Sequence, residues 1–278
     1  MYWIVGSRGL LGRELIRACI SENLPFMGIV KNGSTDIKTY EATWDDIFTE
    51  SNNFNEPIVL INAAGQILND TDWTLSDAVK SNVEPLLNCL MMIKINSNIT
   101  LCQISSSTLS RPAIKSNKSK YYLAKQEVET LTNLNSKIFR NRISLVRLPT
   151  LLDFNYKHSE LISALVQHLH LGLSFVPRFP RETLEMLPSG RAAINTLDLL
   201  RGEKFHAIEI PGLKILVEKF VEIFSLIYFL SVQSEEKNTL TAETIIENYP
   251  DMLFGIDEKY LPDFLSFLLH FMGFIRFK

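Results

Sequence analysis

The sequence predicts an α/β fold in which a doubly wound parallel sheet is followed by a smaller C-terminal lobe. Short apolar runs alternate with helical patterns up to about residue 150. One of these runs, "PIVLINAAG" at residues 57–65, is apolar throughout, which is typical of a strand buried on both faces. Strands that alternate with helices need crossover connections, so the sheet is expected to be parallel and covered on both sides.

The elements of the first domain follow in order from these patterns. Strands are expected within residues 2–6, 25–30, 57–65, 99–107 and 142–149. Helices are expected within residues 11–22, 76–96 and 120–134. In the first helix Leu11, Leu15, Ile16 and Cys19 recur at helical spacing and form one apolar face.

The rhythm changes after residue 150, and residues 151–278 are expected to form the smaller lobe. An amphipathic helix is expected over residues 158–173, a loop over 176–191, a strand within 205–212 and an apolar helix over 220–232. The aromatic C-terminal segment, residues 261–278, is shorter than the roughly 20 apolar residues that a spanning helix needs. We expect it to dock on its own domain, with contact to a membrane surface or a partner as the alternative.

Composition and charge exclude several classes of protein. The chain has 278 residues, 46% of them hydrophobic and 21% charged, which is ordinary for a globular protein. The net charge of -3 gives no general reason to expect a nucleic-acid partner. The three cysteines are widely spaced and match neither a metal site nor a disulfide framework, which indicates a reducing compartment. Without a signal-peptide pattern, the expected location is the cytoplasm.

A glycine-rich turn lies between the first strand and the first helix. In "WIVGSRGLLGREL", residues 3–15, glycine occupies positions 6, 9 and 12. Gly6 would allow a tight turn, Gly9 the close approach of a diphosphate to the backbone, and Gly12 close packing of helix on strand. The alternative is a tight turn that binds nothing.

Further motifs follow this GxxGxxG pattern in a fixed order. They are "NAAG" at residues 62–65, "NV" at 82–83, "SSS" at 105–107, Tyr121-x-x-x-Lys125, and "RLPT" at 147–150. Together they resemble the short-chain dehydrogenase/reductase superfamily, and the long C-terminal half resembles its extended, epimerase/dehydratase-like branch. The resemblance implies a Rossmann-type dinucleotide-binding domain over residues 1–150 and a substrate-binding lobe over residues 151–278.

The resemblance implies a catalytic site of Ser107, Tyr121 and Lys125. Tyr121 and Lys125 share one helix face, and a nearby ammonium lowers the pKa of a phenol. Tyr121 could then exchange a proton with the substrate while hydride moves to or from a nicotinamide. By resemblance, Ser107 would hold the carbonyl oxygen, and Asn82 would support Lys125.

Each catalytic residue has a neighbour that could replace it. Ser106 is the alternative to Ser107, and Tyr122 is the alternative to Tyr121. Tyr122 is disfavoured because Gln126 follows it at the spacing where the chemistry needs a cation.

A nicotinamide cofactor is expected from the same resemblance. Its expected contacts are Gly6, Arg8, Gly9, Leu10, Leu11, Gly12, Lys31, Asn62, Ala63, Ala64, Gly65, Asn82, Tyr121, Lys125, Leu148 and Pro149. No acidic residue follows the second strand before Asp36, whereas Arg8 and Lys31 could meet a ribose 2′-phosphate. The "GSRG" turn is also similar to the "GHRG" turn of GDP-fucose synthases, which use NADPH. NADP is therefore expected, with NAD as the alternative.

The expected reaction is hydride transfer on a nucleotide-linked sugar, either reduction or epimerisation. Ser107, Thr108 and Arg191 are the expected substrate contacts, the last because "GRAAINTLDLL" at residues 190–200 resembles a substrate-binding segment of the extended branch. Candidates for a second base are Cys102, His158 and His206. No metal is expected. The resemblance is also compatible with a homodimer formed through the helices that carry Asn82 and Tyr121. The alternative is that the apolar "PLLNCLMMI" at residues 85–93 is part of the core.

Two other functions stay open at this point. One is a non-catalytic NAD(P)-binding regulator or scaffold on the same fold. The other is a reductase of an apolar carbonyl compound, docked to a membrane by the C-terminal segment.

Overall fold

The computed structural model describes residues 1–31, 41–50, 54–65, 74–110, 120–153, 160–177, 180–202, 206–233, 241–253 and 256–276. The chain forms two compact units. The first consists of Met1–Pro149 and Ser189–Ile210, and the second of Thr150–Pro188 and Pro211–Lys278. The sequence predicts one boundary, at residue 150. The structure places a boundary there too, but it also assigns Ser189–Ile210 to the first unit, which was not predicted.

The first unit contains a seven-stranded sheet with the order β3-β2-β1-β4-β5-β6-β9, in which every pairing is parallel. The strands are β1 (Tyr2–Val5), β2 (Phe26–Val30), β3 (Glu41–Thr43), β4 (Ile58–Asn62), β5 (Ile99–Ser106), β6 (Ile143–Leu148) and β9 (Ala207–Glu209). The predicted doubly wound α/β fold is confirmed. The strand order reverses direction between β1 and β4, where such folds leave a crevice at the carboxyl ends of the strands.

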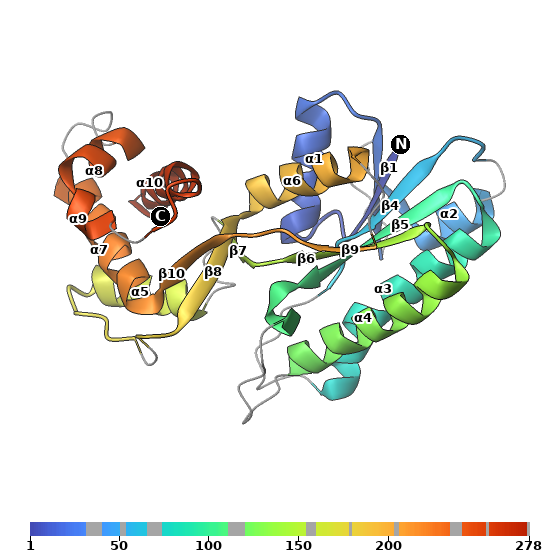
Figure 1. Ribbon diagram of the computed structural model, residues 1–278, viewed down its shortest axis with the longest axis horizontal. Helices are drawn as coiled ribbons and strands as arrows, with labels where there is room; N and C mark the ends of the chain where they lie inside the picture. Colours follow the sequence, from blue (N-terminus) through green and yellow to red (C-terminus); the bar gives the residue numbers. More distant parts are fainter. Residues whose placement is uncertain are drawn as a thin grey trace. The chain divides into compact units, whose positions relative to one another are not determined.

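Helices cover both faces of this sheet (Figure 1). On one face α1 (Leu10–Ser21) packs on α6 (Ser189–Arg201), and on the other α3 (Leu75–Ile95) packs on α4 (Lys120–Ile138). The short helix α2 (Trp44–Glu50) directly follows β3. The core beneath α3 and α4 is built from fully buried side chains such as Trp3, Leu60 and Met92. Their burial explains the uninterrupted apolar runs in the sequence, since both faces of the sheet are covered.

Several elements differ from those expected from the sequence. The strand β3 and the helix α2 were not predicted, because three and seven residues are too few to show a clear periodic pattern. Residues 183–188, expected within a loop, form the strand β8 (Thr183–Pro188), and α6 begins directly after it. β9, expected in the lobe, pairs with β6 and extends the sheet of the first unit.

The second unit is built around a three-stranded sheet and an aromatic core. β8 pairs with β7 (Thr150–Leu152) in parallel and with β10 (Leu213–Leu216) in antiparallel orientation. The helices are α5 (Glu160–His170), α7 (Val217–Gln233), α8 (Ala242–Asn248), α9 (Pro250–Leu253) and α10 (Leu261–Arg276). Phe220 and Phe224 of α7 pack with Phe264 and Phe271 of α10, and all four are buried.

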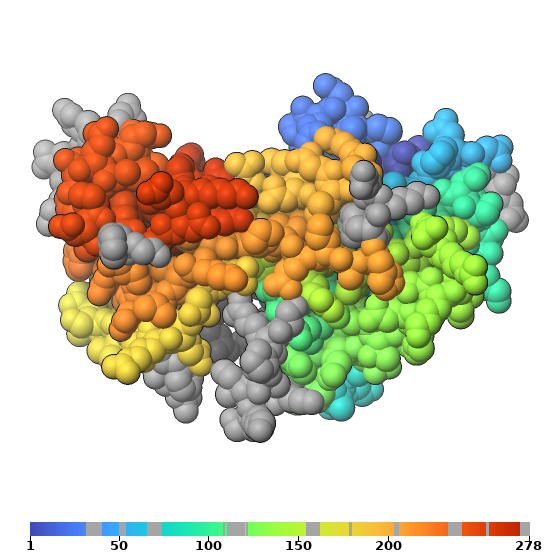
Figure 2. All heavy atoms as spheres, viewed as in Figure 1, coloured from blue at the N-terminus to red at the C-terminus, as the bar shows by residue number. Residues whose placement is uncertain are grey.

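The C-terminal segment therefore docks on its own unit, as expected. α10 packs against α7 and α8, and Figure 2 shows its atoms, in deep red, lying against the orange-red atoms of α8. Within the described ranges, no helix is both long enough and apolar enough to cross a membrane.

Candidate functional site

Several residues predicted from the sequence to be functional lie at the carboxyl edge of the seven-stranded sheet. Gly6 follows β1, Gly65 comes three residues after β4, and Ser107 follows β5. Because all these strands are parallel, the three positions share one edge of the sheet. They flank the point where the strand order reverses, which is the usual position of a ligand in an open parallel sheet.

The glycine turn depends on the absence of side chains. Gly6 has a φ of +78°, in the left-handed region that favours glycine. A Cβ at Gly6 would lie 2.8 Å from the Cα of Ala64, and one at Gly12 only 2.1 Å from the carbonyl oxygen of Gly6. The backbone N–H of Gly9 donates to that same oxygen at 2.8 Å. The turn is therefore packed tightly against both α1 and the segment after β4.

The N-terminus of α1 is open to an anion. Gly9 is the N-cap residue and offers no side chain to the first backbone N–H groups of the helix. The first turn of α1 also contains no acidic residue. Unpaired N–H groups and the helix dipole together favour negative charge at such a position.

A cavity of about 820 Å³ opens beside this turn. Its walls include residues 5–9, 29–31 and 63–65, together with Trp44, Asp77, Lys80, Ser81, Glu84, Pro85 and Asn88. Of the expected cofactor contacts, Gly6, Arg8, Gly9, Lys31, Ala63, Ala64 and Gly65 line it. The turn, the ends of β2 and β4 and the helix α3 thus enclose one space.

Other expected contacts lie outside this wall. Leu11, Leu148 and Pro149 are buried, and Leu10 is half-buried at the start of α1. Asn62 is fully buried, and its Nδ2 donates to Oε1 of Gln103 on β5 at 2.7 Å. Its Oδ1 accepts from the backbone N–H of Ala64 at 3.3 Å. Asn62 therefore stabilises the turn after β4 without lining the cavity.

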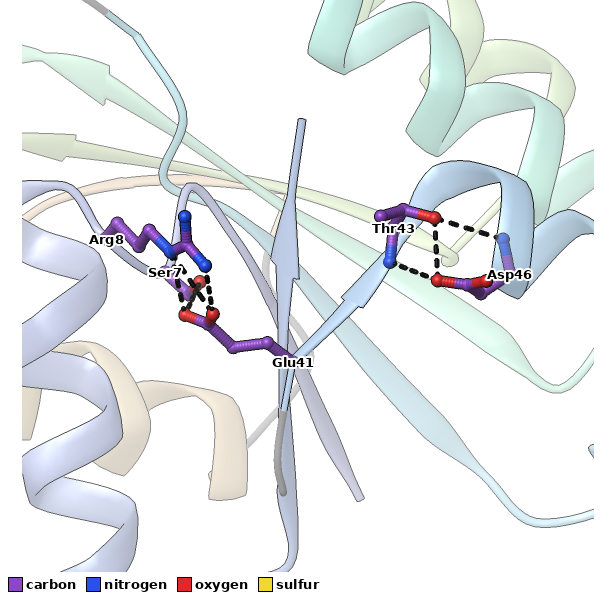
Figure 3. A network of polar contacts seen from close by, with 5 residues as sticks. All are labelled: Ser7, Arg8, Glu41, Thr43 and Asp46. Atoms are coloured by element: carbon purple, nitrogen blue, oxygen red, sulfur yellow. Dashed lines mark hydrogen bonds and ion pairs between the residues drawn. The ribbon is translucent and has the colours of Figure 1, made fainter. Parts of the chain in front are cut away.

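Two ion pairs lie at this cavity. Arg8 donates from Nη2 to Oε2 of Glu41 at 2.6 Å, and Nζ of Lys31 lies 3.6 Å from Oε2 of Glu84 (Figure 3 shows the first pair). Hydrogen bonding to Glu41 raises the pKa of the Arg8 guanidinium. Both cations expected to meet a 2′-phosphate are therefore already close to a carboxylate. Asp36, the first acid after β2 in the sequence, lies outside the described residues.

Glu41 and Trp44 were missed by the sequence reasoning. A signal for their position does exist: Thr43 and Asp46 have the spacing of a helix-capping pair. In the structure the side chain of Thr43 accepts from the N–H of Asp46 at 3.3 Å, and Asp46 accepts from the N–H of Thr43 at 2.8 Å. The signal marks the start of α2 but not the contact between Glu41 and Arg8.

Lys125 and Asn82 meet at the turn after β4. A Cβ at Gly65 would lie 2.6 Å from Oδ1 of Asn82 and 2.8 Å from Nζ of Lys125. Both side chains are buried, and within the described part of the chain Oδ1 of Asn82 has no hydrogen-bond partner. Burial lowers the pKa of Lys125 to about 8, an effect that the nearby Glu129 carboxylate partly opposes.

Glu129 is itself held by an arginine. Nε and Nη2 of Arg147 on β6 donate to the two carboxylate oxygens of Glu129 at 2.8 and 2.6 Å. Glu129 lies one helical turn after Lys125 on α4, so this pair ties the helix to the sheet beside Lys125. The sequence reasoning included Arg147 only as part of a motif and did not find Glu129.

The other two predicted catalytic residues, Ser107 and Tyr121, lie at the end of β5 and at the start of α4. Ser107 is buried and begins a short 3-10 helix, η2 (Ser107–Ser110), that packs against α4. Tyr121 is the second residue of α4, and its side chain, like that of Thr108, lies outside the described part of the chain. Ser106 ends β5 and is half-buried, as is Tyr122.

The more distant candidates are dispersed. Arg191 is exposed on α6, which belongs to the first unit and not to the expected lobe. His206 is exposed before β9, and His158 is outside the described residues. Cys102 is fully buried in β5, where burial raises the pKa of its thiol to about 12, so the thiol stays protonated at neutral pH.

No protein-family model and no curated protein matches this sequence. The fold is nevertheless similar to solved structures. A UDP-N-acetylglucosamine 4-epimerase from Bacillus cereus matches with a TM-score of 0.67 and 15% identity, over 99% of this chain and 96% of that one. A thiolation-reductase di-domain from an archaeal non-ribosomal peptide synthetase matches with a TM-score of 0.68 and 16% identity, over 99% and 88%.

A third similar structure was solved together with a dinucleotide. The UDP-glucose 4-epimerase of Thermus thermophilus, in complex with NAD, matches with a TM-score of 0.62 and 12% identity, over 82% of each chain. At these identities the likeness establishes the fold of the present chain.

Proposed function

We propose that the first unit binds a nicotinamide dinucleotide and that the chain is an oxidoreductase or epimerase acting on a nucleotide-linked sugar. The position of Gly65 carries this proposal. On one side Gly65 lines the cavity beside the glycine turn, and on the other it borders Nζ of Lys125 and Oδ1 of Asn82. Gly65 thus connects the wall of the cavity to a buried lysine on the helix of the Tyr121-x-x-x-Lys125 motif.

The glycine turn fits the diphosphate of such a cofactor. Gly6 and Gly9 line the cavity, and the open N-terminus of α1 favours negative charge at this point. When bound, a nicotinamide would donate or accept hydride. Oδ1 of Asn82, which has no hydrogen-bond partner among the described residues, could accept a hydrogen bond from a polar group beside Lys125. This fits the role that the resemblance assigns to these two residues.

The proposed chemistry uses the charge of Lys125. With a pKa of about 8, Lys125 is largely protonated at neutral pH. Its ammonium stabilises the phenolate of Tyr121, so that Tyr121 can pass a proton to or from the substrate oxygen. Ser107, at the end of β5, donates a hydrogen bond to that oxygen.

The similar structures support the substrate class of this proposal. They include two UDP-sugar epimerases, and also a reductase di-domain and an L-threonine dehydrogenase from Phytophthora infestans. The sugar-nucleotide assignment follows the motifs and these epimerases. Both reduction and epimerisation are compatible with one proton-transferring tyrosine.

Titration with NADH and NADPH, followed by nicotinamide fluorescence, tests the cofactor. We expect saturable binding by the wild-type protein and a loss of about tenfold or more in Gly12→Ala, because the added Cβ displaces the turn. Gly202→Ala is the matched control, since the nearest described atom to its Cβ would be the carbonyl oxygen of Leu199 at 3.5 Å. Absence of binding by the wild-type protein would refute the proposal and leave a scaffold as the better description.

Turnover of nucleotide-linked keto sugars and of UDP-hexoses then tests the reaction. Tyr121→Phe retains the ring and removes the proton-transferring hydroxyl. Binding that persists while turnover falls would support the assigned role of Tyr121. Equal turnover by Tyr121→Phe would assign proton transfer to another group, with Tyr122 the first to test.

A further inference from the structure

We infer that Glu41 makes this cavity selective for a dinucleotide without a ribose 2′-phosphate, by holding Arg8 in an ion pair at the cavity wall. The inference rests on the proposed function, because it concerns the dinucleotide that the first unit would bind. It reverses the preference for NADP that the sequence alone suggests.

The contact between Arg8 and Glu41 uses two donors of the guanidinium. Nε and Nη2 of Arg8 donate to Oε2 of Glu41 at 3.1 and 2.6 Å, and Oγ of Ser7 donates to Oε1 at 3.3 Å. Figure 3 shows the carboxylate of Glu41 reaching from its strand toward both residues of the glycine turn. Nε and Nη2 of Arg8, which could otherwise bind a phosphate, are therefore directed at this carboxylate.

The position of Glu41 is set by the sheet. Glu41 is the first residue of β3 and lies opposite Gly28 of β2. A Cβ on Gly28 would be 2.8 Å from Cβ of Ser7 and 3.4 Å from Cγ of Glu41, so the glycine leaves the space in which they meet. The capping contacts of Thr43 and Asp46 fix the other end of β3. A glycine inside a strand commonly marks such a close approach.

The other cations of the cavity wall also have carboxylates nearby. Nζ of Lys31 lies 3.6 Å from Oε2 of Glu84. Hydrogen bonds with Thr74 lower the pKa of Asp77, and the charge of Lys80 lowers it further. The wall and its described partners therefore hold three cations and three carboxylates. A 2′-phosphate dianion needs surplus positive charge, whereas an unphosphorylated ribose brings no charge to these pairs.

Glu41→Gln tests the inference, because it removes the charge and keeps the shape of the side chain. Dissociation constants for NADH and NADPH would be measured at one ionic strength in the wild type, Glu41→Gln and the double variant Glu41→Gln/Arg8→Ala. We expect the wild type to prefer NADH. In Glu41→Gln we expect the affinity for NADPH to rise about tenfold while that for NADH changes less than about threefold. The double variant should lose the gain, because Arg8 supplies it.

Asp198→Asn is the matched control, since it neutralises an exposed carboxylate of the same unit outside the cavity wall. Its preference between the two dinucleotides should equal that of the wild type. A separate arm uses Arg8→Ala alone: a roughly tenfold loss of NADPH affinity there would show that Arg8 already serves a phosphate, and would overturn the inference.

Two further outcomes distinguish this inference from the proposed function. A wild type that prefers NADPH, or an unchanged preference in folded Glu41→Gln, would overturn the role of Glu41 and leave dinucleotide binding intact. A wild type that binds neither dinucleotide would overturn both.

Discussion

Two ion pairs in the first unit have nearly the same geometry and very different surroundings. Arg8–Glu41 and Arg147–Glu129 each use Nε and Nη2 of the arginine, with a shortest N–O distance of 2.6 Å. The side chains of the first pair are 50% and 24% exposed, whereas those of the second are 29% and 10% exposed. Water screens the first pair, and it reaches the second much less.

This difference separates the two roles of an arginine–carboxylate contact. An exposed pair contributes little to stability, but a ligand that enters the cavity meets its charges directly. A buried pair cannot lose one partner without leaving the other poorly solvated, so it fixes the elements that carry it. Arg147–Glu129 accordingly ties α4 to β6 and holds a negative charge beside Lys125.

The largest effect is expected at Lys125, the buried charge that Glu129 adjoins. Under the proposed function, Lys125→Met should reduce turnover by about 10²- to 10⁴-fold, because it removes the ammonium that is proposed to activate Tyr121. The same variant should be more stable at pH 7, by as much as about 3 kcal/mol, because a buried charge is removed. Steady-state kinetics and urea unfolding of the two proteins measure both effects.

The pH dependence of unfolding shows whether the charge of Lys125 lowers or raises the stability of the folded protein. Burial lowers the pKa of Lys125 from 10.5 to about 8, so between these values the unfolded chain binds more protons than the folded one. Below pH 8 the cost of the buried charge is fully present, and stability should rise as the pH increases through this window. Lys125→Met should lack that rise. A wild-type and a variant curve of equal slope would contradict a buried, charged Lys125.

An intermediate effect is expected when the less exposed pair, Arg147–Glu129, is broken. Glu129→Gln should lower the free energy of unfolding by about 1–3 kcal/mol, because Arg147 loses its charged partner. The Glu129 carboxylate raises the pKa of Lys125, so its removal should also move the alkaline limb of the pH–rate profile to lower pH. Glu127→Gln, on an exposed position of the same helix, is the control. Equal unfolding and pH profiles for both variants would refute the anchoring role of Glu129.

The smallest effect on stability is expected when the exposed pair is broken. Arg8→Ala should leave the thermal midpoint of unfolding unchanged within error, because water can hydrate the partly exposed Glu41 carboxylate once the guanidinium is removed. Differential scanning calorimetry measures this directly. A midpoint that falls as far as in Glu129→Gln would remove the contrast between the two pairs.

The sequence was sufficient to predict the parallel sheet and the order of its main elements. Long apolar runs and a helical period are local signals, and β1, β4, β5 and β6 all appear where such runs occur. The glycine turn was found because close backbone contacts exclude every other residue type, as at Gly12. Elements of only three residues, such as β3, are too short to show a repeated pattern.

Parts of the site depend on contacts that no local pattern contains. Glu41 is 33 residues from Arg8 in the chain, and the two meet only because β3 is placed beside β2 and opposite Gly28. Asn62 was expected in the cofactor site because of its motif. In the structure its side chain is buried against Gln103, since alternate residues of a strand point to opposite faces.

The return of Ser189–Ile210 to the first unit has a consequence for synthesis of the chain. During translation β6 is complete at Leu148, but its neighbour β9 does not begin until Ala207 has been added. Over that interval the nascent sheet carries an unpaired edge at β6, and α1 lacks the helix α6 that packs on it. A ribosome paused between these residues would therefore expose an aggregation-prone intermediate, and a protein cut after Pro149 would keep that edge permanently.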